Sequence, residues 1–380
     1  MKKKMFITPI PGILLCLIVM VAGLYGAELI GVLLKVLGIL SEDSKTPVSG
    51  IFAAIIIGMV IRNTVNLSDR FTEGISFSMK YLLRAGIILL GLRLSLMEAL
   101  KLGAVGIPLI ALCITAGLIV TLYLTKKMGQ SSRLGTLIAS GTGICGVTAI
   151  MATAPVIKAK EDEISYAVAN ITIFGLTGML LYPFLANFLF ADDPIKAGLF
   201  LGTAIHDTAQ VTGAALIFDQ MFQNALVVDA ATVTKLTRNL FIIAIIPLVS
   251  YFYFSQTKKN QGENVEKTEL PKWYRFIPVF VIGFLLLSIV RTIGDGTLVH
   301  TGNAFGFLQA DTWKSIYTNL SSFGTTYLLG MAMAGVGLST NFKMFKGIGF
   351  RPFYIGLTAA LSVGVVSVLF VSVLGGLVSL

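Results

Sequence analysis

A histidine and an aspartate, His206 and Asp207, stand side by side between uncharged apolar stretches of 9 and 11 residues. Ionisable side chains at such depth cost at least about 2.5–3.5 kcal/mol each to insert into a membrane, and they usually mark ion pathways or proton relays. Histidine also changes charge near neutral pH, so this pair could carry protons. Gly202, Thr203 and Gln210 extend the candidate binding segment. A solvated loop between two short hairpins is the alternative that the sequence leaves open.

A glycine-rich segment lies 61 residues earlier in the chain. Its candidate substrate-binding residues are Gly141, Thr142, Gly143, Cys145, Gly146 and Thr148. Each glycine costs a helix about 1 kcal/mol relative to alanine, so three in six residues predict an unwound break. Unwound backbone in a membrane normally lines a cavity, and the helix that resumes after it presents N–H groups suited to an anion. Close helix packing through small residues is the competing interpretation.

A third candidate is the pair Lys235 and Arg238, three residues apart at the head of a 19-residue uncharged run. This spacing places both side chains on one face of a helix. The planar guanidinium of Arg238 fits an oxyanion such as sulfate or a carboxylate. Basic residues at the end of a span also extend toward the membrane surface or set topology, and spacing alone does not decide between the two interpretations.

The composition indicates which elements position these residues. Only 13% of the 380 residues are charged and 55% are hydrophobic, and residues 134–157 form one of several long uncharged runs. About 20 apolar residues in a helix cross a bilayer, so we expect an all-α polytopic membrane protein. The net charge of +10 comes from scattered basic residues, which does not favour nucleic acid. The three cysteines lie in apolar segments, so we expect neither a disulfide framework nor a metal site, and no cofactor.

Hydropathy predicts about 11 transmembrane segments. They cover residues 11–40, 47–61, 75–96, 102–125, 134–157, 164–190, 195–218, 233–254, 276–290, 320–338 and 353–380. Nine crossings plus two re-entrant segments is the alternative, because the loops on either side of residues 164–190 break the charge pattern. We favour crossing but interrupted helices, with breaks near 141–146 and 202–210.

Three regions follow from this pattern. Residues 1–255 form an N-terminal membrane region that carries both interrupted helices, residues 256–275 a cytoplasmic linker, and residues 276–380 a C-terminal membrane region. Basic residues such as Lys2–Lys4 and a lysine-poor loop at 41–45 predict a cytoplasmic N-terminus and an outside C-terminus.

Two internal matches predict a duplicated scaffold of inverted repeats, as many secondary transporters have. Residues 91–96 resemble residues 335–340, each closing an apolar run. Residues 141–144 and 202–205 share the pattern Gly-Thr-x-Ile, 61 residues apart.

Taken together, these segments resemble the sulfate exporter family of bacterial multi-pass membrane proteins. The resemblance rests on Ile-Cys-Gly-Val-Thr-Ala-Ile at 144–150, Ile-His-Asp-Thr-Ala-Gln-Val at 205–211 and Lys-Leu-Thr-Arg at 235–238. The family is in turn similar to the cation/proton antiporter and anion transporter group. That similarity implies inverted repeats, crossed interrupted helices and alternating access in a bacterial inner membrane.

We therefore expect a secondary transporter that exports a small inorganic or sulfonate-type anion such as sulfate, coupled to protons through His206 and Asp207. Its partners would be the anion, protons and the lipid bilayer, and a homo-oligomer is left open. A cation/proton antiporter with Asp207 as the ion ligand is the alternative. An intramembrane enzyme with Cys145 as nucleophile and His206 as base is a third reading, although we expect no enzyme.

Overall fold

The computed structural model describes residues 9–37, 48–261, 278–345 and 349–375. Helices form nearly all of these residues, and within these ranges extended backbone pairs only in an isolated bridge between Ala304 and Leu308. The chain divides into two compact units. Unit 1 comprises residues 1–100, 212–229 and 279–342, and unit 2 comprises residues 101–211, 230–278 and 343–380.

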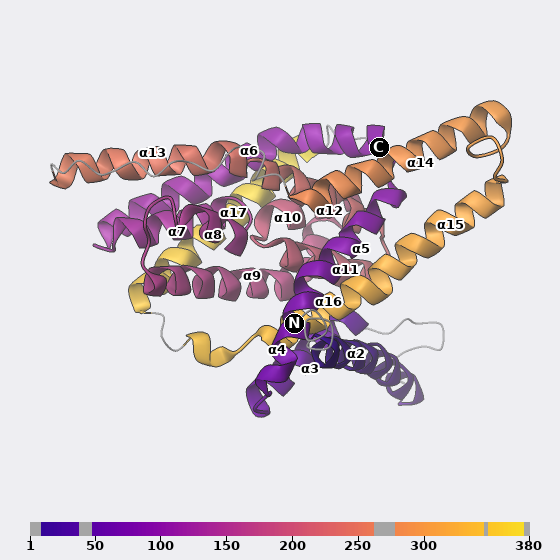
Figure 1. Cartoon of the computed structure of the whole chain (residues 1–380), viewed down its shortest axis with the longest axis horizontal. Coiled ribbons are helices and arrows are strands. Elements are labelled where there is room, and N and C mark those ends of the chain that lie inside the picture. Colours follow the sequence, from indigo (N-terminus) through magenta and orange to yellow (C-terminus); the bar gives the residue numbers. More distant parts are fainter. Residues whose placement is uncertain (1–8, 38–47, 262–277, 346–348, 376–380) are drawn as a thin grey trace, which may run out of the picture. The chain divides into compact units, whose positions relative to one another are not determined.

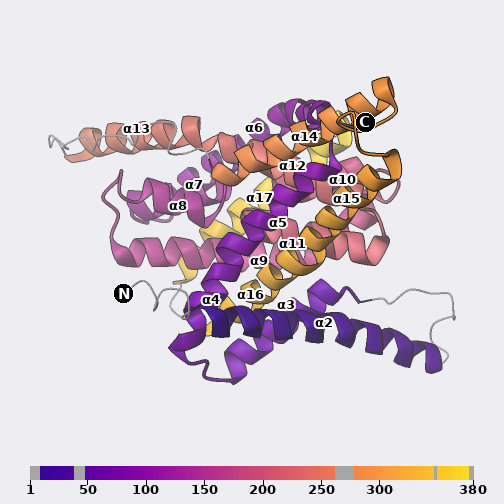
Figure 2. The same cartoon turned by 45° about the vertical axis from the view of Figure 1, so that its right-hand side comes forward.

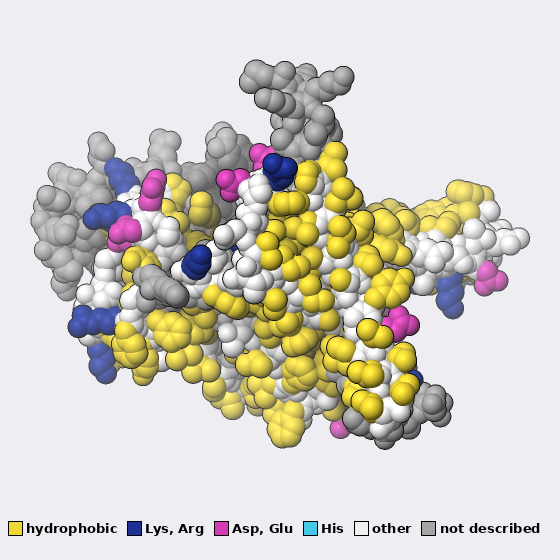
Figure 3. All heavy atoms as spheres, turned by 90° about the horizontal axis from the view of Figure 1, so that it is seen from below, with side chains coloured by type: hydrophobic (Ala, Val, Ile, Leu, Met, Phe, Trp, Pro, Cys, Tyr) yellow, Lys and Arg dark blue, Asp and Glu magenta, His cyan; other side chains and the backbone are white. Residues whose placement is uncertain are grey.

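Six of the described helices are long and apolar enough to cross a membrane, and a pair bent by 45° makes a seventh candidate. The six are Ile10–Val36, Asp69–Arg93, Leu96–Lys127, Glu161–Phe190, Val279–Thr301 and Phe350–Leu374, and the bent pair is Leu226–Leu240 with Ile242–Ser255. Hydrophobic side chains cover much of the face shown in Figure 3. The chain is a multi-pass, all-helical membrane protein.

The expected count of about 11 spans is not supported by helix length and composition. Predicted segments 134–157 and 195–218 are each divided into two short helices, because glycine and polar residues interrupt the helical hydrogen bonds. Predicted segment 47–61 is a single helix of 15 residues, α3 (Gly50–Thr64).

Unit 1 is built mainly from the helices of residues 1–100 and 279–342. Its elements are α2 (Ile10–Val36), α3 (Gly50–Thr64), η1 (Asp69–Phe71), α4 (Thr72–Phe77), η2 (Ser78–Leu82), α5 (Leu83–Leu90), η3 (Gly91–Arg93), α14 (Val279–Thr301), α15 (Ala310–Phe323), η5 (Gly324–Leu329) and α16 (Gly330–Ser339). Helices α2, α3 and α16 pack together. Gly58 of α3 approaches α16 so closely that a Cβ atom there would lie 2.9 Å from the Ala334 carbonyl oxygen.

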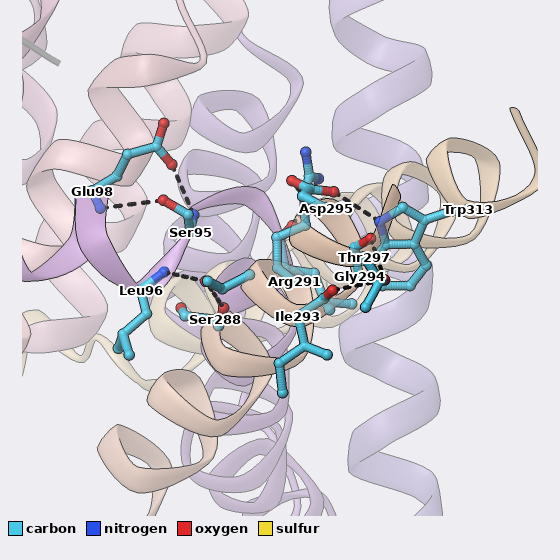
Figure 4. Close-up of polar contacts among 12 residues, drawn as sticks. Ser95, Leu96, Glu98, Ser288, Arg291, Ile293, Gly294, Asp295, Thr297 and Trp313 are labelled. Carbon is cyan, nitrogen blue, oxygen red and sulfur yellow. Dashed lines mark hydrogen bonds and ion pairs between the residues drawn. The ribbon is translucent and has the colours of Figure 1, made fainter. Parts of the chain in front are cut away.

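A polar cluster joins α14 to α15 within unit 1 (Figure 4). Arg291 Nε lies 2.6 Å from Asp295 Oδ2, and the indole N–H of Trp313 donates to Asp295 Oδ1 at 2.8 Å. The guanidinium of Arg291 also stacks on the ring of Tyr317, 3.4 Å from its centroid. These contacts pair the charge of Arg291 with that of Asp295, which is itself partly exposed.

Unit 2 carries the two glycine-rich segments. Its elements are α6 (Leu96–Lys127, from Lys101 on), α7 (Ser132–Gly143), α8 (Val147–Thr153), α9 (Glu161–Phe190), α10 (Pro194–Ala204), α13 (Ile242–Gln261) and α17 (Phe350–Leu374). Two helices, α11 (Thr208–Phe222) and α12 (Leu226–Leu240), begin in one unit and end in the other. Helices α7, α8 and α9 lie side by side in both Figure 1 and Figure 2, and α17 packs on α10.

Each unit combines segments from both sides of the predicted linker at 256–275. Helix α13 continues into that linker as far as Gln261, and the remainder lies outside the described residues. The basic start Lys2–Lys4 and the loop at 41–45 are also outside them. The orientation of the termini stays a prediction.

Candidate functional site

Both glycine-rich segments interrupt helices where the sequence predicts a break. Helix α7 ends at Gly143 and α8 begins at Val147, while α10 ends at Ala204 and α11 begins at Thr208. All of these residues belong to unit 2. The first break includes a backbone conformation at Gly146 (φ +67°, ψ −129°) that is essentially restricted to glycine.

The two breaks touch each other at Gly146. A Cβ atom added to Gly146 would lie 3.0 Å from Asp207 Oδ2 and 3.2 Å from Asp207 Cα. Glycine is therefore required here for two reasons, the positive φ and the close approach of the second break. This contact brings residues 61 positions apart into one site.

Arg238 of α12 joins the ends of the two helices that precede the breaks. Its Nη2 donates to Thr142 O at 2.6 Å and its Nε to Gly143 O at 3.1 Å, both at the end of α7. Its Nη1 donates to Thr203 O at 2.7 Å and to Ile205 O at 3.1 Å, at the end of α10. The side chain is fully buried.

Lys235, one helical turn earlier on α12, makes the corresponding contacts inside the breaks. Its ammonium donates to Ile144 O at 3.3 Å and to Ile205 O at 3.1 Å. It also donates to the carbonyl oxygen of His206. Like Arg238, Lys235 is almost completely buried.

These contacts change the role expected for the two cations. The spacing predicts that Lys235 and Arg238 share a helix face, and they do, but their donors bind backbone carbonyls. The last carbonyls of a helix lack intrahelical partners and carry the negative end of its dipole. Lys235 and Arg238 therefore neutralise the ends of α7 and α10 and position both breaks. As direct substrate ligands they have few donors left.

Asp207 occupies the start of the helix that follows the second break. Its Oδ1 accepts a hydrogen bond from the backbone N–H of Ala209 at 2.9 Å. The backbone N–H groups of Val147 and Gln210 also interact with this carboxylate. Asp207 therefore caps α11 and contacts the start of α8, where positive dipole ends favour a negative charge.

Three buried polar atoms around these breaks have no hydrogen-bond partner among the described residues. They are His206 Nδ1, Thr142 Oγ1 and Gln210 Oε1. His206 is 2% exposed and Thr142 1% exposed. Such atoms are rare in folded proteins because each costs about 1–3 kcal/mol, and they commonly indicate a bound water or ligand.

Other predicted site residues have packing roles in the structure. A Cβ atom at Gly141 would meet the side chains of Ile171 and Ile150, and one at Gly202 would lie 2.7 Å from Thr234 Cβ. The hydroxyl of Thr203 is 2.6 Å from that of Ser367 on α17 and donates to Leu199 O. These contacts favour the small-residue packing interpretation for this part of the predicted set.

Cys145 and Thr148, both in the first glycine-rich segment, lie in opposite surroundings, one buried and the other exposed. Cys145 is 4% exposed and packs in an apolar cluster with Ile144, Ala149 and residues of α13. Thr148, in the first turn of α8, is exposed. Asp207 is half-buried, so it and Thr148 are the least covered of the predicted site residues at the breaks.

Sequence reasoning missed two contributors to this site. Asn239 donates to the hydroxyl of Thr208 at 3.2 Å, and its position directly after Arg238 could have indicated it. Ser367 contacts Thr203 from a helix near the C-terminus, and no signal in the sequence pointed to it.

The sequence model of the family described as Conserved hypothetical protein 698 matches residues 11–356. A UPF0324 membrane protein of Streptococcus agalactiae is 33% identical over 371 residues, covering 98% of this chain and 99% of that protein. Another from Fusobacterium nucleatum is 33% identical, with 87% of this chain and 91% of the relative covered. A third, from Bacillus cereus, is 35% identical, with 85% and 86% covered. The chain therefore belongs to the Conserved hypothetical protein 698 family, a family of bacterial membrane proteins.

Proposed function

We propose that the protein is a secondary active transporter of a small inorganic or sulfonate-type anion such as sulfate, coupled to protons. The observation that carries the proposal is the meeting of two helix breaks in one unit, held by Lys235 and Arg238. Membrane transporters bind substrates and coupling ions where interrupted helices leave unwound backbone near the bilayer midplane. His206 and Asp207 are the proposed proton-coupling residues.

The balance of charges supports an anion. Two buried cations and one carboxylate, Lys235, Arg238 and Asp207, lie at the breaks. Although the cations bind carbonyl oxygens, their fields act over several ångströms in a medium of low dielectric constant. The first-turn N–H groups of α11 add a positive dipole end. The orphaned atoms of His206 and Thr142 can donate or accept hydrogen bonds with the oxygens of the anion.

A cation/proton antiporter with Asp207 as the ion ligand is the alternative function. Asp207 is the carboxylate that would bind the cation, but its oxygens already accept backbone N–H groups, and Lys235 lies close to it. Both features weaken the binding of a metal cation. Sodium movement that needs no anion would favour this alternative.

The internal match of Gly-Thr-x-Ile supports a duplicated, inverted-repeat architecture with alternating access. Arg238 bonds the equivalent carbonyls of Thr142 and Thr203, and Lys235 those of Ile144 and Ile205. The proposal further includes about eleven crossings, counting the interrupted helices, in a bacterial inner membrane with the N-terminus inside. It leaves a homo-oligomer open.

Flux measurements on the full chain in proteoliposomes test this function. We expect saturable movement of labelled sulfate, or of a competing anion from a panel of sulfonates and halides, that exceeds the flux in empty liposomes. His206→Ala should reduce this flux at least tenfold while the purified variant keeps its melting temperature. No saturable flux of any anion in the panel, with intact protein, would overturn the proposal.

A further inference from the structure

The N-terminal end of α11 already holds a negative charge in this structure. Asp207 Oδ1 accepts the N–H of Ala209, and the carboxylate interacts with the N–H groups of Gln210 and Val147. These are the backbone donors that a substrate oxyanion would use at a helix start. Helix α11 has 15 residues, long enough to present a positive dipole end.

Independent polar groups around this helix start point to a second occupant. His206 directly precedes Asp207, and its Nδ1 is buried without a partner among the described residues. Thr142 at the end of α7 is 1% exposed, and its hydroxyl likewise lacks a partner there. The imidazole of His206 lies next to the Thr142 carbonyl, so both residues lie where the two breaks meet.

The charged and titratable groups facing Asp207 come from three elements. Lys235 reaches it from α12, with Arg238 one turn farther along the same helix. Cys145 faces it from the break between α7 and α8, and His206 adjoins it in its own break. Asp207 is the one carboxylate among these groups. Its charge therefore decides whether a further anion meets repulsion at the start of α11.

We propose that the Asp207 carboxylate is a tethered occupant of the anion site, which a substrate oxyanion replaces only when Asp207 is protonated. This inference rests on the proposed function and deepens it. A proton from the bulk binds one carboxylate oxygen. The neutral side chain then holds the backbone N–H groups less strongly and no longer repels an anion, so the oxyanion displaces it from them. When the anion leaves, the proton also leaves and the carboxylate returns to the helix start.

The direction of coupled transport follows from this exchange. Because the proton and the anion must be bound in the same state, they cross the membrane together. The protein is then a proton/anion symporter, and an inward proton gradient drives uptake of the anion. The resemblance to sulfate exporters implies the opposite direction, so flux under a defined gradient distinguishes the two.

Aspartate at a helix start is also an ordinary cap, and the variants must separate these roles. Asparagine is as good a helix cap as aspartate but has no charge, so Asp207→Asn caps α11 when no anion is bound and mimics the protonated side chain that an oxyanion displaces. Asp193 offers a matched control in the same unit. It caps α10 through the Lys196 N–H at 3.0 Å and lies at the opposite end of that 11-residue helix from the second break.

The experiment measures labelled sulfate binding and flux with purified full-length protein, between mildly acidic and mildly alkaline pH. Sulfate stays fully ionised over this range, so a change in affinity reports on the protein. For the wild type and Asp193→Asn, we expect the dissociation constant to rise about tenfold per pH unit once Asp207 is ionised. For Asp207→Asn, we expect pH-independent binding and sulfate exchange between equal pools, but at least a tenfold loss of uptake driven by a pH gradient.

Three results would overturn the inference. One is an equal pH slope in the wild type and Asp207→Asn, and another is sulfate flux in the wild type that does not depend on the pH gradient. In both cases the anion still moves, so the proposed function stands. The third is the absence of saturable flux for sulfate and the whole anion panel, which removes the proposed function together with this inference.

Discussion

The guanidinium of Arg238 bonds the backbone carbonyl of Thr142 at 2.6 Å, and it bonds that of Thr203 at 2.7 Å. These two threonines hold the same position in the repeated pattern Gly-Thr-x-Ile. The side chain of Arg238 thus makes equivalent hydrogen bonds to the two breaks. Lys235 likewise bonds the equivalent carbonyls of Ile144 and Ile205. The two copies of the pattern therefore correspond in the backbone carbonyls that they offer to Arg238 and Lys235, and not in the contacts of their threonine hydroxyls.

Arg238→Ala should destabilise the protein strongly. The substitution removes four hydrogen bonds and leaves buried carbonyls at the ends of α7 and α10, each costing about 1–3 kcal/mol when it has no partner. Arg238→Lys should recover only part of the loss, because one ammonium cannot span both helix ends. Melting temperatures in detergent provide the measurement.

Exposed Arg351, which makes one long contact to Met128 O, is the control, and Arg351→Ala should change the melting temperature little. Equal melting temperatures for Arg238→Ala and Arg351→Ala would show that the bonds at the breaks contribute nothing.

Gly146→Ala should impair both stability and anion flux. An alanine in the Gly146 conformation (φ +67°, ψ −129°) costs about 1–3 kcal/mol, and its Cβ would also press on Asp207. Gly129 is a control for the positive φ, since it has φ +64° but open space around its missing Cβ. Gly129→Ala should share the loss of stability and keep the flux, measured as sulfate uptake per folded protein. Equal sulfate uptake per folded protein in the two variants would show that the contact between Gly146 and Asp207 does not affect transport.

The ion pair between Arg93 and Asp229 predicts a coupled pair of substitutions in unit 1. Arg93 Nε lies 3.0 Å from Asp229 Oδ1, and the side chains are 18% and 6% exposed. Arg93→Ala leaves the carboxylate buried without its cation, and removal of one partner from a buried pair costs about 3–5 kcal/mol. Adding Asp229→Asn should restore a large part of this, because no charge is then left behind. A double-mutant cycle on unfolding measures the coupling, and additive effects would argue against it.

Cys145→Ser should keep sulfate flux within about twofold of the wild type. Cys145 is 4% exposed among apolar neighbours, and a similar small side chain fits the space. An intramembrane enzyme with a Cys145 nucleophile predicts complete loss of activity, because a hydroxyl does not replace a thiolate. A loss of flux beyond a hundredfold in a variant with wild-type melting temperature would revive the enzyme interpretation.

Two features of this protein follow from the sequence by itself. Long uncharged runs such as 134–157 require a membrane, because no aqueous surface covers that much apolar area. The positions of the helix breaks also follow from the sequence. They are indicated by the glycines at 141, 143 and 146 and by the pair His206-Asp207, because low helix propensity and the cost of charge in lipid depend only on the residues at each position.

The tertiary structure alone decided what these residues contact. The spacing of Lys235 and Arg238 predicts that they share a helix face. It does not predict that this face meets two helix ends, or that the two side chains donate their hydrogen bonds to the carbonyls there. Likewise, Gly141 and Gly202 look the same as Gly146 in the sequence, although the first two serve packing and only the last has a positive φ. Hydrogen bonding and close packing depend on partners that are tens of residues away. Their identity is therefore set by how the helices meet and not by local pattern.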